Sequence, residues 1–184
     1  MTYPVKATLK CAIYMSLLSP GVAKAPMFIG TDNCKYNERQ SLALSSEDFD
    51  RIGGAGWRNL AYQEGCLHLA ADLIAKYRIT NKDRTPILLW YEGQLRATLG
   101  DYRSAIRLMK KSRLKGADPY GYNIYTDATI AYLERDYSRL RGLATQLNKV
   151  KWEVGVNLNA LVVNRLVKCH DRPYKEAYIK CDKQ

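Results

Sequence analysis

"RATLGDYRSAIRLMKKS", residues 96–112, decides the fold, because it has the pattern of a turn between two packed helices. Gly100 is placed to end the first helix, where a left-handed backbone conformation costs glycine little. Tyr102 is expected to pack over the turn, and Ala105 to let the second helix lie close to the first. The stretch therefore predicts a pair of antiparallel helices.

The same pattern recurs along the chain at a spacing of 35 residues. Segments 56–77, 87–112 and 122–147 align by three sets of residues: Gly65, Gly100 and Arg135 in the turn, Leu67, Tyr102 and Tyr137 after it, and Ala70, Ala105 and Leu140 in the second helix. A partial fourth segment places Tyr174 and Ala177 in the last two sets, 37 residues further on. A fixed period in this range is typical of stacked helical repeats.

This spacing predicts an all-α fold of stacked antiparallel helix pairs, each of which buries its apolar side against the next. An ordinary helical bundle is the alternative. Thr85-Pro86 and Asp118-Pro119 each place a capping side chain before a proline at the first helical position. Arg135 stands where glycine is expected, which predicts a tighter or differently capped turn.

The second segment resembles the tetratricopeptide repeat, a two-helix unit of about 34 residues. The residues in consensus positions are Gly93, Leu99, Gly100, Asp101, Tyr102, Ala105 and Ile106. The resemblance covers roughly residues 56–181 and implies a right-handed solenoid of about three to four degenerate units. The segments "ATIAYLERDYSRL" and "VKCHDRPYKEAYIKC" are also similar to those of uncharacterised exported bacterial proteins with tetratricopeptide-like folds.

The N-terminus has the layout of a secretory signal peptide, residues 1–25, that is removed on export. Lys6 and Lys10 precede an apolar run over 11–23, which ends in the small-x-small site Ala23-Lys24-Ala25. The run is too short to span a bilayer; a buried N-terminal helix is the alternative. We expect residues 26–44 to be irregular and 45–184 to form the helical repeat domain, in the periplasm or outside the cell.

Four cysteines remain after cleavage, namely Cys34, Cys66, Cys169 and Cys181. An even number in an exported chain predicts two disulfides, and we favour Cys34–Cys66 and Cys169–Cys181 because each joins segments expected to be neighbours. The other two connectivities and free buried thiols stay open. We expect neither a metal nor a cofactor, because the chain has no CxxC motif and its two histidines lie far apart.

The first helix of each pair in a curved stack lines the inner surface. By the register above, an aromatic and polar groove would be formed by Asn59, Tyr62, Gln63, Trp90, Gln94, Thr98, Tyr122, Tyr125, Thr129 and Tyr132. The resemblance implies that this concave face holds a peptide or protein segment. Packing between helices is the alternative for the aromatic residues, because aromatics at helical spacing usually belong to a core.

Basic residues gather on the second helix of the second pair: Arg103, Arg107, Lys110, Lys111 and Lys115. The net charge is +11, and without the leader it is 26 − 18 = +8, which favours an acidic partner. A solvated helix face is the alternative. Nucleic acid is disfavoured by export and by the absence of a nucleic-acid-binding motif.

No nucleophile elbow, phosphate loop or metalloprotease helix occurs in the sequence. The leading hypothesis is therefore a non-enzymatic, exported protein- or peptide-binding module of the bacterial envelope, and in a specific version an immunity protein that neutralises a secreted toxin. The alternatives are an enzyme that modifies an envelope polymer through paired carboxylates, and a binder of anionic lipid or polymer through the basic face.

Overall fold

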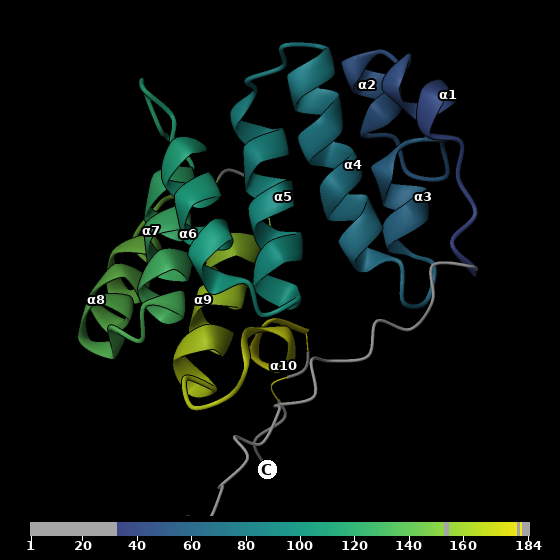
Figure 1. Cartoon of the computed structure of the whole chain (residues 1–184). Coiled ribbons are helices and arrows are strands. Elements are labelled where there is room, and N and C mark those ends of the chain that lie inside the picture. Colours follow the sequence, from purple (N-terminus) through teal and green to yellow (C-terminus); the bar gives the residue numbers. More distant parts are fainter. Residues whose placement is uncertain (1–32, 153–154, 180, 182–184) are drawn as a thin grey trace, which may run out of the picture.

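The computed structural model describes residues 33–152, 155–179 and 181, and over these residues it is all-helical, without a strand (Figure 1). Its helices are α1 (Glu38–Leu42), α2 (Ser46–Phe49), α3 (Trp57–Ala61), α4 (Leu67–Thr80), α5 (Pro86–Thr98), α6 (Tyr102–Lys111), α7 (Tyr122–Leu133), α8 (Tyr137–Leu147), α9 (Leu158–Lys168) and α10 (Tyr174–Ile179). The predicted all-α fold is confirmed. The predicted signal peptide lies outside the described residues.

Successive helices pack as antiparallel pairs, and each pair contacts the next through α4–α5, α6–α7 and α8–α9. The second helices of the pairs begin at Leu67, Tyr102, Tyr137 and Tyr174, the residues that the alignment placed in one set. Helix α10 departs from this order, because it packs against α9 and also against α5. No helix of the described residues is long and apolar enough to cross a membrane.

The turns within the first three pairs each contain one residue in the left-handed conformation. Gly65, Gly100 and Arg135 all have positive φ, at 76°, 86° and 59°. The prediction of a different turn at Arg135 is wrong: this arginine adopts the left-handed conformation that the two glycines adopt.

Of the two helix starts predicted at a proline, one agrees with the structure. Pro86 opens α5, although the Thr85 side chain makes no cap hydrogen bond. At α2, the Ser45 hydroxyl accepts the N–H of Asp48 and caps the helix. Helix α7, however, begins at Tyr122 rather than at Pro119. The Asp118 carboxylate still acts as the cap, because it accepts the backbone N–H groups of Tyr122 and Asn123 at 2.7 Å each. Residues 26–44, expected to be irregular, contain α1.

Two hydrophobic clusters form the interior, one under α3–α5 and one from α5 to α10, and Tyr91 on α5 packs against both. Two disulfides tie the first and last segments of the described chain to the helices: Cys34 pairs with Cys66, and Cys169 pairs with Cys181. This is the connectivity that the sequence favoured. It fixes the N-terminal segment against the start of α4, and it ties the chain after α10 to the end of α9.

Candidate functional site

A cleft of about 320 Å³ opens between α3, the start of α4, the second half of α5, and α10; we call it the α3–α5–α10 cleft. Its lining consists mainly of apolar groups, together with the rings of Tyr62 and Trp57. It also contains one cation and three uncharged polar side chains, those of Gln94, Thr98 and Tyr178. The lining residues are Trp57, Arg58, Ala61, Tyr62, Leu67, Gln94, Leu95, Thr98, Tyr178 and Ile179. No carboxylate is among them.

A hydrogen-bonded group of three side chains fixes the base of the cleft. The Gln94 amide donates to the Tyr178 hydroxyl at 2.8 Å and to the Tyr125 hydroxyl at 3.3 Å. The two hydroxyls lie 3.4 Å apart, so α5, α7 and α10 meet at this point. Burial raises the pKa of Tyr125 well above its usual value, and the neighbouring Tyr174 and Tyr178 add to the shift. The Tyr125 phenol therefore stays neutral and acts by hydrogen bonding.

One wall of the cleft is a cation packed against two aromatic rings that also contact each other. The Arg58 guanidinium lies 4.5 Å from the ring centroids of both Trp57 and Tyr91. Its Nε donates to the backbone oxygen of Asp50 at 2.7 Å, and its Nη2 lies 2.9 Å from the Asp50 carboxylate. The charge of Arg58 is compensated within the protein, so this wall presents a flat, fixed surface rather than a free cation.

The rim of the cleft exposes two large side chains. Tyr62 at the end of α3 is 73% exposed, and Ile179 at the end of α10 is 58% exposed. Thr98 donates its hydroxyl to the backbone of Gln94, which leaves its methyl group as a contact surface. Exposed apolar groups beside a preformed concavity are typical of a binding surface.

The predicted groove divides between the cleft and the interior. Tyr62, Gln94 and Thr98 line the cleft. Asn59 is exposed on α3, whereas Gln63 is engaged with the backbone of Lys35, accepting its N–H at 2.6 Å and donating to its carbonyl at 2.9 Å. Gln63 therefore holds the N-terminal segment in place.

The expectation that Trp90, Tyr125, Thr129 and Tyr132 line an open surface is corrected, because all four are buried, and Tyr122 is half-buried. Trp90 packs against the rings of Tyr122 and Tyr125 at 5.9 and 4.8 Å. The alternative of packing between helices holds for these residues.

The chain's own C-terminal segment covers much of the predicted groove. The Tyr132 hydroxyl donates to the backbone oxygens of Cys169 and Arg172. The Tyr102 hydroxyl accepts the backbone N–H of Tyr174, whose ring is fully buried beside that of Tyr132. What remains open is the part of the inner surface between α10 and α3.

The cleft residues Trp57, Arg58, Tyr178 and Ile179 were missed by the sequence interpretation. The pattern around α3 signals only burial, and the contact between Gln94 and Tyr178 joins residues 84 positions apart. A local pattern does not encode such a contact.

The basic side chains predicted as a patch lie on and after α6, which does not contribute to the cleft. Arg103, Arg107, Lys110, Lys111 and Lys115 are all exposed. Lys110 forms an ion pair with Glu134 on the neighbouring pair, at 3.0 Å. The described part of the chain provides no ion-pair partner for the other four.

A second cleft, of about 380 Å³, lies between α2 and α5, and its lining includes two acids. Glu47 is paired with Arg51 at 3.6 Å, and Asp50 accepts hydrogen bonds from Trp57 and Arg58. Both carboxylates thus have structural partners. Among the described residues no three His, Cys, Asp or Glu side chains are grouped to hold a metal ion.

Comparisons of the chain with protein-family models, with curated proteins and with solved structures give no match.

Proposed function

We propose that this chain is an exported, non-enzymatic binding module of the bacterial envelope, which takes a segment of another protein into the α3–α5–α10 cleft. The observation that carries the proposal is a preformed apolar cleft whose rim exposes Tyr62 and Ile179. A concave site with a few convergent polar groups is the usual form of a binding site.

The lining defines the chemistry of the segment. Trp57, Leu67 and Leu95 offer apolar contact, and Gln94 and Tyr178 offer hydrogen bonds at the base. A volume of about 320 Å³ accommodates one or two side chains rather than a folded element. We therefore infer that the partner inserts an apolar or aromatic side chain from an extended segment or a loop.

Two disulfides support an oxidising compartment, because such bonds persist mainly in exported proteins. A small, disulfide-bonded module with a preformed apolar cleft fits an immunity protein that blocks a secreted toxin. A toxin-like reading frame beside this one would favour that version of the proposal.

The test is affinity capture from the native envelope with the mature chain and with three single variants. Tyr62→Ala and Ile179→Ser change the rim, and we expect each to weaken capture of one specific protein by about tenfold, because each removes a large apolar contact. Ile79→Ser is the matched control, since Ile79 is exposed (77%) and does not line the cleft. Equal capture by all four proteins contradicts the proposal.

The unpaired basic residues on α6 favour a second candidate, docking of an anionic polymer or protein on the face that carries Arg103, Arg107 and Lys111. Such binding falls steeply with ionic strength, because exposed charges are screened within about 10 Å at 0.1 M salt. Capture through the cleft is expected to survive moderate salt, so a salt series separates the two candidates.

A further inference from the structure

A cluster of exposed apolar side chains lies where the α6–α7 connection meets the segment between α8 and α9. Val156 and Leu161 are 62% and 48% exposed, and Tyr120 and Trp152 are 46% and 39% exposed. The rings of Tyr120 and Trp152 contact each other edge to face, with centroids 5.3 Å apart. A shallow cleft of about 380 Å³ lies among Trp152, Val156 and Leu161.

The two connections are held in fixed positions, so the exposure of these apolar side chains is a fixed feature of the fold. A Cβ on Gly121 would lie 2.8 Å from the Leu147 side chain and 3.1 Å from that of Val150, which shows how closely the connections approach. The amides of Asn148 and Asn164 exchange two hydrogen bonds of 3.1 Å.

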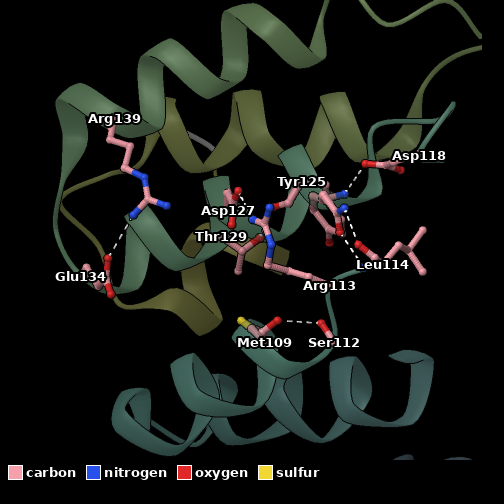
Figure 2. Close-up of polar contacts among 11 residues, drawn as sticks. Met109, Ser112, Arg113, Leu114, Asp118, Tyr125, Asp127, Thr129, Glu134 and Arg139 are labelled. Carbon is pink, nitrogen blue, oxygen red and sulfur yellow. Dashed lines mark hydrogen bonds and ion pairs between the residues drawn. The ribbon is translucent and has the colours of Figure 1, made fainter. Parts of the chain in front are cut away.

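Polar contacts also secure the α6–α7 connection (Figure 2). Asn123 accepts the backbone N–H of Leu114 at 2.8 Å and donates to its carbonyl at 3.1 Å, and Asp118 caps α7. Arg113 forms an ion pair with Asp127. This connection therefore presents Tyr120 in a defined place.

The charge around the cluster is positive. Lys149 and Lys151 alternate with Val150 and Trp152, and both lysines are exposed, with no ion-pair partner among the described residues. In the sequence from 147 to 168 the basic residues are Lys149, Lys151, Arg165 and Lys168, and the only acid is Glu153.

We propose that Tyr120, Lys149, Lys151, Trp152, Val156 and Leu161 form a docking surface for a bilayer that contains anionic phospholipid. Trp and Tyr side chains settle at the level of the headgroups, aliphatic side chains enter the acyl boundary, and lysines reach the phosphates. Exposed aromatic and aliphatic side chains beside two exposed lysines combine the groups that an anionic bilayer surface binds, and this combination favours the lipid surface.

The docking surface is separate from the α3–α5–α10 cleft. Trp90 near the start of α5 contacts Tyr122 at the start of α7, which places the start of α5 toward the docking surface. The cleft uses Gln94 and Thr98 from the second half of α5. The two surfaces share no lining residue, and the docking surface does not depend on the cleft's function.

The test is sedimentation of the mature chain with phosphatidylcholine vesicles, with and without about 30% phosphatidylglycerol. We expect binding only to the anionic vesicles, with a blue shift of the emission from Trp152, since Trp57 and Trp90 are already buried. Each interfacial lysine contributes about 1 kcal/mol, so Lys149→Ser/Lys151→Ser is expected to weaken binding about tenfold or more. Trp152→Ala is expected to weaken it about tenfold.

Lys35→Ser/Arg39→Ser is the matched control, because it removes two exposed positive charges before and within α1, outside both the docking surface and the basic face of α6. We expect this pair to leave the vesicle affinity within about threefold of the parent. If both double variants lose the same vesicle affinity, binding depends only on the net charge of the protein, and the proposal is overturned. So does absence of binding to the anionic vesicles. Vesicle binding that survives Trp152→Ala, together with loss of a protein partner in that variant, identifies a protein interface instead.

Discussion

The Gln94 side chain on α5 donates a hydrogen bond of 2.8 Å to the Tyr178 hydroxyl on α10, and this bond joins residues 84 positions apart. Helix α10 has only six residues, too few to be stable alone. Its position depends on burial of Tyr174 and on the Cys169–Cys181 disulfide, which encloses it. One side of the α3–α5–α10 cleft therefore depends on a covalent bond outside the cleft.

Replacing both Cys169 and Cys181 by serine is expected to destabilise the protein by about 3 kcal/mol, from the loop closed by a sequence separation of 12. The loss should be local. Hydrogen exchange should accelerate in α10 far more than in α3 and α4. The control is the same change at Cys34 and Cys66, which should leave α10 protected. Equal acceleration in all helices would show that α10 does not depend on its own disulfide.

Arg135 and Gly100 end their helices with the same hydrogen bonds. The N–H of Asp136 donates to Ala131 and the N–H of Asp101 donates to Arg96, both at 2.9 Å. A left-handed conformation costs a residue with a side chain roughly 1 kcal/mol relative to glycine. Arg135→Gly is therefore expected to stabilise the protein by about 0.5–1 kcal/mol in chemical denaturation.

The reverse change, Gly100→Ala, should destabilise the protein by about 1 kcal/mol, and it serves as the companion measurement. No heavy atom lies within 4 Å of a Cβ built on Gly100, so the effect isolates the backbone. A destabilised Arg135→Gly would mean that the arginine side chain contributes contacts that outweigh the strain.

The helix pairs could be predicted because the signals that form them are local. The left-handed Gly100, the Asp101 cap and the small residue Ala105 all lie within one short stretch of the sequence. The same local chemistry misplaced the start of α7, because the Asp118 carboxylate reaches past Pro119 to the N–H groups of Tyr122 and Asn123.

The candidate site could be predicted only in part. Tyr62, Gln94 and Thr98 follow from the helix register alone, and they do line the cleft. Tyr178 and Ile179 do not, because the placement of α10 against α5 is set by burial of a distant segment. The same packing of a distant segment buries aromatic residues that the helix register places on an open face, so these residues belong to the core.

Asp101 links stability to pH. Burial opposes ionisation of its carboxyl, but hydrogen bonds from the Ser104 side chain and backbone, with the charges of Arg96 and Arg107, lower its pKa below the usual 3.8. A depressed folded-state pKa gives stability that is complete above the unfolded pKa and lost as pH falls through the folded one.

Asp101→Asn retains an N-cap acceptor but removes the charge. We expect the parent to be more stable than this variant by about 0.5 kcal/mol at neutral pH, because the aspartate is exposed and complements the start of α6. The difference should disappear in acid, below the folded-state pKa. A difference that is independent of pH in urea denaturation would show that the charge contributes nothing.

Two ion pairs join α4 to α5, and their burial differs. Glu92 is 5% exposed and is paired with Arg78, whose Nε has no hydrogen-bond partner. Asp72, paired with Arg96 at 2.6 Å, has a half-exposed side chain. Removing one partner of a buried pair leaves an uncompensated charge, whereas an exposed pair contributes little.

Glu92→Ala is therefore expected to destabilise the protein by about 3 kcal/mol, and Asp72→Ala by less than about 1 kcal/mol. The double variant Arg78→Met/Glu92→Leu should recover most of the loss, because two apolar side chains replace the pair without leaving a charge. Urea denaturation of the four proteins at neutral pH measures these differences. If the double variant is as unstable as Glu92→Ala, packing around the pair rather than the unpaired arginine sets the cost. If Asp72→Ala costs as much as Glu92→Ala, burial does not distinguish the two pairs.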